Sequence, residues 1–447
     1  MPLTLRIIFL ILLVLPEQGN ALGLLDAWEL AVHNDPQYRA AGYERDAGQE
    51  EVALGLSGLL PSLQYSYGAN TNYSTVSQAD NRSNSKVKRD YDSYVSMLSL
   101  RQPLIDYGAY ARYRQGIARK LFADQRYRDK SQELIVRLYR AYSSALLAQE
   151  KTSLLNAQLR AYEEQIQLNR RLLVAGEGTQ TDIDETAARL TLTQVQLIEQ
   201  QDVLDSQLTE LENMMGRSVN LAELRPLTLD ALPQNVSDDR TLAQWRDLAI
   251  RYNARLAGQR ENLDAKHYEI ENSRSGHLPT LQLVASSRNS RSEAEYNYNQ
   301  KYDTQSIGLQ LNVPIYAGGR ISSATRQATA HYQQSQAELD QETRQILAEL
   351  KRQFNLTSSG AAKIRAWQMT VDSAQKVLLA TRRSVLGGER INLDVLLAEQ
   401  QLYNSRRDLA EAKYSWLQSW LELRYNAGTL QENDILQLAA WFEPEKR

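Results

Sequence analysis

The sequence predicts a mainly α-helical protein with a smaller β part, built from two copies of one unit. Three observations lead to this fold class: an internal duplication, two very long segments with almost no glycine or proline, and four short stretches in which apolar and polar residues alternate. Each copy is expected to contain two strands and one long coiled-coil helical hairpin.

The duplication places matching residues about 212 positions apart. Residues 170–177, followed by Asp182, realign on residues 382–389, followed by Asp394. Solenoid repeats have periods of roughly 20 to 50 residues. The repeated unit is therefore the size of a domain.

Residues 1–21 are predicted to be a secretory signal peptide. Arg6 supplies the positive charge, residues 7–15 are apolar, and residues 19–21 have the small side chains of a cleavage site. The apolar stretch is too short to span a bilayer. We expect the mature chain to begin near Leu22 and to work outside the cytoplasm.

Composition excludes several classes of protein. The chain has no cysteine, which removes disulfides, thiolate metal sites and the acylated cysteine of a lipoprotein. The formal net charge is −3, and basic residues are scattered among acidic ones, so no nucleic-acid partner is expected. After the signal, the sequence has no apolar run long enough for a transmembrane helix.

Two segments have the composition of very long helices. Residues 117–175 contain no glycine or proline, and residues 320–386 contain only Gly360. Each helix would be roughly 90 to 100 Å long, which implies coiled-coil packing. The returning helices support this with an apolar residue at every seventh position. These residues are Ile183, Leu190, Leu197, Leu204 and Leu211 in the first copy, and Val395, Leu402, Leu409, Trp416 and Leu423 in the second.

Four stretches between the helices are predicted to be strands; the first and the last alternate cleanly and should have one apolar and one polar face, whereas the middle two alternate less cleanly. They are residues 63–70, 94–100, 281–286 and 306–313. Tyrosines gather near the strand ends, as at a membrane interface, although tyrosine is also common in strands generally. Between the strands of each pair we expect polar loops, at residues 71–90 and 287–301.

Four strands cannot close a barrel, and a bilayer does not tolerate unpaired strand edges. Two possibilities follow: the sheet packs on a soluble core, or several protomers pool their strands. No globular core for the sheet is evident beside helices of this length.

The predicted domain organisation follows the duplication. Its segments are a signal peptide at 1–21, a first repeat at 22–216, a connecting segment at 217–240, a second repeat at 241–428 and a tail at 429–447. The connecting segment, with Pro226 and Pro233, and the tail interrupt the helical pattern. Both are expected to form a collar around the middle of the helices.

Three stretches carry a family resemblance. They are residues 175–182 (Ala-Gly-Glu-Gly-Thr-Gln-Thr-Asp), residues 394–403 (Asp-Val-Leu-Leu-Ala-Glu-Gln-Gln-Leu-Tyr) and residues 425–430 (Tyr-Asn-Ala-Gly-Thr-Leu). With these residues the chain resembles the TolC family of outer-membrane channel-tunnel proteins, over essentially all of the mature chain. The Gly-Glu-Gly-Thr turn is most similar to the type I secretion branch, which exports proteins.

The resemblance implies a homotrimer in the outer membrane of a Gram-negative bacterium. Four strands from each protomer would form a twelve-stranded transmembrane β-barrel, and the hairpins an α-helical barrel that crosses the periplasm and narrows at the helix turns. The implied partners are a periplasmic adaptor (membrane fusion protein), an inner-membrane ABC transporter, outer-membrane lipid and the secreted protein cargo.

The resemblance also implies which polar residues form the gate at the entrance. In the family, an aspartate at the first turn pairs with an arginine of the second copy, and a ring of aspartates narrows the entrance. By position, Thr181 and Asp182 match the first element, Arg390 matches the arginine, and Asp394 matches the ring. Asp394 is thus a possible cation site.

The chain departs from the family pattern at two positions. Val385 stands where the family has a tyrosine, and Leu397 where a second ring aspartate can occur. The closing network is therefore expected to be thinner. As an alternative, Thr179, Thr181 and Asp182 have only a helix-capping role, which such residues often have at N-termini.

The turns are also the predicted docking points for the adaptor. The residues concerned are Gly176, Glu177, Gly178, Gly387, Gly388 and Glu389. No catalytic or cofactor-binding site is predicted, because the histidines lack the spacing of a metal site and no phosphate-binding or nucleophile motif is present. These histidines are His33, His267, His277 and His331.

The sequence therefore predicts a passive trimeric exit duct for type I protein secretion, and no enzyme. Two alternatives stay open: the outer-membrane component of a multidrug efflux pump, which shares the scaffold, and a soluble periplasmic coiled-coil adaptor or structural protein. An adaptor needs one hairpin and a lipoyl-like domain, whereas this chain has two hairpins and tyrosine-flanked strands.

Overall fold

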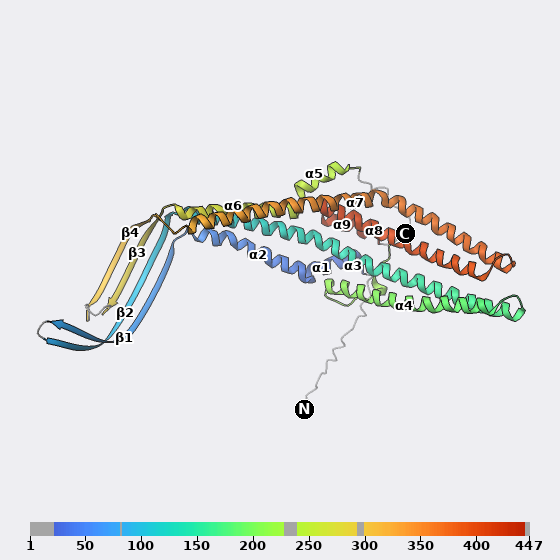
Figure 1. Cartoon of the computed structure of the whole chain (residues 1–447), viewed down its shortest axis with the longest axis horizontal. Helices are drawn as coiled ribbons and strands as arrows, with labels where there is room; N and C mark the ends of the chain where they lie inside the picture. Colours follow the sequence, from blue (N-terminus) through green and yellow to red (C-terminus); the bar gives the residue numbers. More distant parts are fainter. Residues whose placement is uncertain (1–21, 81–82, 228–238, 293–298, 443–447) are drawn as a thin grey trace, which may run out of the picture. The chain divides into compact units, whose positions relative to one another are not determined.

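The computed structural model describes residues 22–80, 83–227, 239–292 and 299–442 (Figure 1). The predicted signal peptide lies outside these residues. The chain forms two compact units. The turn unit comprises Met1–Ala40, Lys130–Ala249 and Leu347–Arg447, and the sheet unit comprises Ala41–Asp129 and Ile250–Ile346.

Two helical hairpins make up most of the chain. α3 (Tyr107–Ala175) turns back into α4 (Gln180–Met215), and α7 (Arg320–Leu386) turns back into α8 (Asn392–Ala427). These bounds confirm the long helices and the returning helices that the sequence predicts. α4 and α8 each have 36 residues, and each ends at a glycine with a left-handed backbone. The duplication therefore extends to the helix ends.

α8 is far more buried than α4 within this chain. Seventeen residues of α8 are buried, compared with five of α4. The heptad residues Val395, Leu402 and Trp416 of α8 are each at most 5% exposed. On α4, Leu192 and Ile198 are 50% and 61% exposed. α8 is thus an interior helix of the turn unit, whereas α4 presents apolar side chains at its surface.

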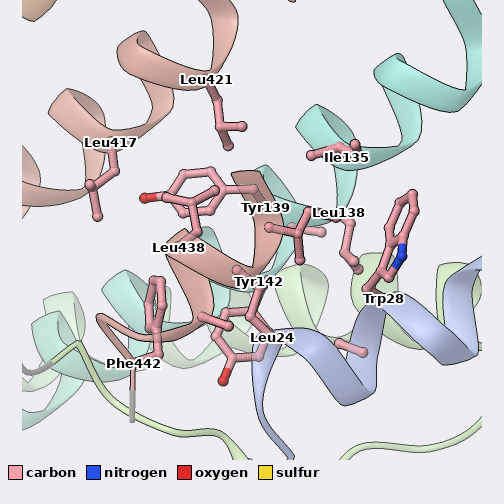
Figure 2. Close-up of a cluster of buried hydrophobic side chains, with 14 of the residues drawn as sticks. Leu24, Trp28, Ile135, Leu138, Tyr139, Tyr142, Leu417, Leu421, Leu438 and Phe442 are labelled. Carbon is pink, nitrogen blue, oxygen red and sulfur yellow. The ribbon is translucent and has the colours of Figure 1, made fainter. Parts of the chain in front are cut away.

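The core of the turn unit forms where α3 packs against α8, α1 (Leu24–Asn34) and α9 (Glu432–Ala439). Figure 2 shows Tyr139 and Tyr142 of α3 surrounded by leucines of these helices. The ring of Phe442 meets that of Tyr142 edge-on, with the ring centroids 5.5 Å apart. Aromatic and leucine side chains from distant parts of the sequence therefore share one core.

The hydroxyl group of Tyr142 ties two flanking segments to α3. It lies 3.0 Å from the carbonyl oxygen of Leu22 and accepts a hydrogen bond from the main-chain N–H of Arg225, also at 3.0 Å. Leu22 and Leu224 form a parallel β-bridge, next to the single-turn helix η1 (Leu221–Glu223). Burial raises the pKa of Tyr142 to about 12, so its hydroxyl group keeps its proton.

The sheet unit contains, among the described residues, an antiparallel sheet of four strands in the order β1-β2-β3-β4. The strands are β1 (Ser62–Asp80), β2 (Ser83–Ile105), β3 (Thr280–Arg291) and β4 (Lys301–Asn312). β2 pairs with β3, which joins the strands of the first copy to those of the second. β1 and β4 lie at the two edges.

One face of the sheet is apolar across all four strands, and the alternation in β1 and β4 predicts this face. One row of directly opposed residues consists of Leu63, Leu100, Ala285 and Ile307. Directly opposed residues share a face of the sheet. Ile307 is 76% exposed, and β4 is exposed along its whole length. The apolar face is therefore not covered within the sheet unit.

The loop predicted at residues 71–90 is wrong. β1 and β2 continue through most of this stretch as a paired ribbon. The Thr71 hydroxyl group donates to the Asp92 carboxylate at 2.9 Å, and the Asn72 amide donates to the Ser93 hydroxyl group at 2.8 Å. Such residues favour turns when considered alone, but here their side chains pair across strands and support the ladder.

The second predicted loop, at residues 287–301, is also too long. β3 continues to Arg291 and β4 begins at Lys301. Residues 293–298, at the centre of the predicted loop, lie outside the described residues. Residues 287–291 and Lys301 of this stretch therefore belong to strands.

The remaining helices are α2 (Pro36–Ser57), α5 (Leu242–Tyr252), α6 (Ala254–Arg274) and the single turn η3 (Ser275–His277). In the sheet unit, α2 packs main chain to main chain on α3. A Cβ atom on Gly116 of α3 would lie 2.3 Å from the carbonyl oxygen of Glu51 on α2. Only a residue without a side chain permits this approach.

Candidate functional site at the helix turns

The first helix turn has a defined main-chain geometry. The N–H of Glu177 donates to the carbonyl oxygen of Leu172 at 2.9 Å, and the N–H of Gly176 donates to that of Leu173 at 3.1 Å. Gly176 has a φ of 78°. This is a Schellman motif, in which a left-handed glycine ends the helix and two backward bonds satisfy its last carbonyl groups.

The second turn repeats this motif residue for residue. Glu389 donates to Ser384 at 2.9 Å. Gly388, with a φ of 74°, donates to Val385 at 3.0 Å. The best-matched stretch of the duplication is therefore a turn whose conformation depends on one glycine in each copy. Glu177 and Glu389 complete the motif through their main chain and leave their side chains exposed.

The other two predicted docking glycines, Gly178 and Gly387, differ in their surroundings. A Cβ atom on Gly178 would lie 3.1 Å from the Cβ atom of Leu172, so this glycine keeps the two sides of the first turn close together. A Cβ atom on Gly387 would have its nearest neighbour, the carbonyl oxygen of Ser384, at 3.6 Å. Contact of either turn with an adaptor stays a prediction.

The start of α4 is capped by its own side chains. The hydroxyl oxygen of Thr179 accepts a hydrogen bond from the N–H of Asp182 at 3.2 Å. The Asp182 carboxylate accepts bonds from the N–H and the hydroxyl group of Thr179, at 3.0 and 2.6 Å. This capping box satisfies main-chain donors at the helix N-terminus, so the capping role considered for Thr179 and Asp182 is present. The side chain of Thr181 is exposed beside them.

The start of α8 lacks a cap of this kind. Ile391 occupies the position of Thr179 and has no side chain that can form a hydrogen bond. Asp394 occupies the position of Asp182, and its main-chain N–H donates to the carbonyl oxygen of Ile391 at 3.1 Å. Its carboxylate accepts no hydrogen bond from the part of the chain that the structure describes. This carboxylate is therefore available for another role.

Asp182 and Arg390 do not form an ion pair in this chain. Arg390 is exposed, and its side chain has no hydrogen-bond or ion-pair partner among the residues described. The Asp182 carboxylate is occupied by the cap with Thr179. The predicted pairing of Asp182 with Arg390 stays a prediction for neighbouring chains of an assembly.

Four buried polar residues near the turns were missed by the sequence prediction. They are Gln165 and Asn169 of α3, Thr186 of α4 and Asn392 of α8, each at most 7% exposed. A signal for them is present in α3, where Gln158, Tyr162, Gln165 and Asn169 follow at spacings of four, three and four residues. This is the spacing of a coiled-coil seam, occupied here mostly by amides instead of leucines.

A partly buried ion pair joins α7 and α8 near the second turn. Arg382 donates to the carboxylate of Glu399, whose side chain is 10% exposed. Burial raises the pKa of Glu399, while Arg382 and Arg406 act in the opposite direction. The first copy has Ala187 at the position of Glu399. The pair therefore has no counterpart in the first hairpin.

No metal centre emerges from these side chains. Among residues 22–80, 83–227, 239–292 and 299–442, no group of three or more histidine, aspartate or glutamate residues is placed to hold a metal ion. None of the helices in this described part is both long enough and apolar enough to cross a membrane. The turns instead contain a side-chain cap at the start of α4, exposed charged groups and a buried polar cluster.

Comparison with known proteins identifies the family. The family model described as outer membrane efflux protein matches residues 27–217 and 245–429, one block for each repeat. The chain belongs to this family. Membership in the outer membrane efflux protein family confirms the resemblance to TolC that the turn residues indicate, since the relatives include the outer membrane protein TolC of Escherichia coli, 27% identical over 434 residues.

Two relatives of the outer membrane efflux protein family are similar along nearly the whole chain. The proteases secretion protein PrtF of Dickeya chrysanthemi is 66% identical over 425 residues, which cover 95% of this chain and 92% of PrtF. The alkaline protease secretion protein AprF of Pseudomonas aeruginosa is 47% identical over 431 residues, which cover 96% of this chain and 89% of AprF. Both are described as secretion proteins and not as enzymes.

Solved structures confirm the fold class. The CmeC outer membrane channel of Campylobacter jejuni matches with a TM-score of 0.78 and 15% identity over 95% of this chain and 90% of CmeC. The outer membrane protein VceC of Vibrio cholerae matches with a TM-score of 0.76 and 17% identity over 91% of this chain and 96% of VceC. The family and its outer-membrane members also confirm the predicted location, and they contradict the alternative of a soluble periplasmic adaptor.

Proposed function

We propose that this chain forms the outer-membrane exit duct of a type I secretion system through which a protease leaves the cell. The observation that carries the proposal is the 66% identity to the proteases secretion protein PrtF over 95% of the chain. The relative at 47% identity is also named for protease secretion. The family description keeps an exit duct for drug efflux as the alternative.

The sheet supports assembly from several copies. β1 and β4 lie at its edges, and in the described chain neither has a strand on its outer side. Unpaired main-chain groups cost several kcal/mol each in the interior of a bilayer. Pairing β4 of one copy with β1 of the next removes both edges, and three copies then form a twelve-stranded barrel.

The surface of α4 supports the same assembly. Leu192, Val195 and Ile198 are 50%, 48% and 61% exposed. They are spaced three residues apart, so they lie on adjoining parts of the helix surface. Burial against a second copy of the chain would remove this apolar surface from water. A homotrimer thus accounts for the exposed features of both units.

At the turns we propose an entrance that a periplasmic adaptor and an inner-membrane ABC transporter contact. Three copies of the Asp394 carboxylate near one axis repel each other, which favours a bound cation. The absence of a cap at the start of α8 supports this role, because the Asp394 carboxylate is not occupied within the described chain. The exposed side chains of Glu177, Glu389 and Arg390 supply charges for a partner.

Restored protease export tests the proposed function. The host is a Gram-negative strain that has the transporter and adaptor of a protease-secretion system but lacks its outer-membrane duct. The complete chain should return protease activity to the medium, and a variant without residues 301–312, which form the edge strand β4, should not.

Two results contradict the proposal. Protease that stays inside the cells while the chain is present in the outer membrane overturns protein export. Restored drug resistance in an efflux-deficient host without protease export favours the efflux alternative. Separately, the purified chain should run as a trimer in detergent, and a stable monomer in water without detergent overturns the pooled sheet.

A further inference from the structure

Four buried polar side chains connect the two hairpins just behind their turns. Gln165, Asn169, Thr186 and Asn392 are 7%, 3%, 0% and 6% exposed. Burying an amide or hydroxyl group without a partner costs about 1–3 kcal/mol, so such groups are expected to bond to one another. No side-chain atom of these four is among the buried atoms that lack a partner in the described chain.

The amide of Asn392 bonds to the first hairpin through both of its ends. Its oxygen accepts hydrogen bonds from the amides of Gln165 at 2.9 Å and Asn169 at 3.2 Å, both on α3. Its nitrogen donates to the hydroxyl oxygen of Thr186 at 3.2 Å and to the carbonyl oxygen of Asp182 at 3.3 Å, both on α4. One side chain of α8 thus bonds to both helices of the other hairpin.

Asp182 is the point at which this cluster meets the turn. Its carbonyl oxygen also accepts hydrogen bonds from Asn169 at 3.0 Å and from the hydroxyl group of Thr186 at 2.7 Å. Its carboxylate caps α4 together with Thr179. Asn392 is the first residue of α8 and lies two positions from both Arg390 and Asp394. The cluster therefore fixes the residues proposed to line the entrance.

The interior of the second hairpin at this depth is mostly apolar, apart from Thr381 and the Arg382–Glu399 ion pair. In the second hairpin, Thr381 corresponds to Asn169 of the first hairpin, and Ala398 corresponds to Thr186. The cluster around Ala398 is apolar and consists of Ala374, Leu378, Val395, Ala398 and Leu402. Apolar contacts tolerate small sliding movements, whereas hydrogen bonds between buried amides specify one arrangement.

We infer that Gln165, Asn169, Thr186 and Asn392 act as one positioning cluster, the amide clasp, which locks the start of α8 onto the α3–α4 hairpin. The clasp holds Arg390 and Asp394 at a fixed position relative to Asp182. This inference rests on the proposed function, because it takes the turns to be the entrance.

Hydrogen exchange in the purified full-length trimer tests the clasp. Asn392→Leu keeps a side chain of similar size and removes all four bonds. The amides of residues 396–400, near the start of α8, should exchange at least tenfold faster, since tenfold corresponds to about 1.4 kcal/mol and each of the four net hydrogen bonds contributes about 1 kcal/mol. Asn169→Leu should have a similar effect. The double variant Asn169→Leu/Asn392→Leu should exchange only slightly faster than either single variant, because the residues act as a unit.

Asn156→Leu is the matched control. Asn156 is a partly buried asparagine of α3, and its amide bonds at 3.0 Å to the carbonyl oxygen of Thr152 on the same helix. It should leave the exchange of residues 396–400 unchanged. If Asn392→Leu does not yield a trimer, Thr186→Val carries the same test, because it keeps the side-chain shape and removes only the hydroxyl group.

Ion current separates positioning from mere stability. Assembled Asn392→Leu channels in a planar bilayer should show a higher and more variable conductance than the parent and Asn156→Leu channels. A side chain that only stabilises the fold would lower the yield of trimer without changing the current of assembled channels. Unchanged exchange in Asn392→Leu, equal acceleration in Asn156→Leu, or additive effects in the double variant overturn the clasp.

Hydrogen exchange and protease export test the clasp and the proposed function separately. A trimer that shows the expected exchange but restores no protease export keeps the clasp and refutes the secretion duct. A trimer that restores export with unchanged exchange in Asn392→Leu keeps the duct and refutes the clasp.

Discussion

The turns of the two hairpins have the same main-chain conformation, but different side-chain contacts hold them in place. Both turns have a left-handed glycine and the same two backward main-chain bonds. The first hairpin caps its returning helix with its own Thr179 and Asp182. The second has Ile391 at the cap position, and Asn392 bonds to the first hairpin instead. α8 buries seventeen residues and α4 five, although both have 36.

This difference teaches which part of a duplicated unit is governed locally. A Schellman turn needs one glycine and main-chain bonds, so it is the same in both copies while the surrounding side chains differ. Burial depends on neighbours instead. α8 packs among α3, α7 and α9, whereas α4 presents apolar residues outward. The heptad residues of α4 from Ile183 to Leu204 are thus only half-buried, and its exposed apolar residues lie between the heptad positions.

The largest effect is expected where α7 meets α8. A Cβ atom on Gly360 would lie 2.1 Å from Cδ1 of Trp416, so Gly360→Ala should lower the free energy of unfolding by about 2 kcal/mol. The first hairpin has Ala148 and Leu204 at these positions. The double variant Gly360→Ala/Trp416→Leu copies that pair, and its loss in free energy of unfolding should be smaller than the sum of the losses in the two single variants. Denaturant unfolding followed by circular dichroism measures this, and strictly additive losses would contradict it.

The next effect should be equal in both hairpins. Gly176→Ala and Gly388→Ala each place a side chain at a φ near 75°, which should cost about 1 kcal/mol. Gly387→Ala is the control, because Gly387 does not have a positive φ and has no close neighbour. Thermal unfolding of the three variants checks the prediction. A clearly larger loss at one turn would show that the two turns are not equivalent.

Exchanging the caps should have opposite effects on the two hairpins. Thr179→Ile removes the cap of α4 and should cost about 1 kcal/mol. Ile391→Thr should stabilise α8 by about 0.5 kcal/mol, since Ile391 is 63% exposed and loses little burial. The new cap also occupies the carboxylate of Asp394, so block of ion current by divalent cations should weaken as it does in Asp394→Asn. Unchanged block in both variants would place the cation site elsewhere.

The smallest effect concerns pH and Glu399 of the second hairpin. Burial raises the pKa of Glu399 above the ordinary 4.5, so the folded chain holds this proton more tightly than the unfolded chain. Stability therefore falls as pH rises from 4.5 through the raised pKa. Glu399→Gln should reduce this fall, and Glu177→Gln, exposed on the first turn, should not. Thermal midpoints at about pH 5 and about pH 7 measure it. If the thermal midpoint falls equally in both variants, the charge of Arg382 offsets the effect of burial on the pKa of Glu399.

Local patterns predicted the elements that depend on neighbours in sequence. The long helices follow from segments with almost no glycine or proline, and the apolar sheet face follows from alternation around Leu63 and Ile307. The extension of β1 and β2 was missed because Asn72 and Ser93 look like loop residues until they are paired. The amide clasp was missed for a similar reason, since Asn392 bonds to residues 206 to 227 positions away.

The pairing of β2 with β3 has a consequence for how the chain folds. The β1–β2 and β3–β4 pairs join strands that follow each other in sequence, whereas the Tyr94 hydroxyl group of β2 bonds to Asn289 of β3, 195 positions later. Contacts between such distant positions form slowly, because a long loop must close first. Until they form, β2 is a further open edge, and open apolar strands aggregate readily. This slow pairing therefore lengthens the time for which a newly exported chain has open strand edges that need protection.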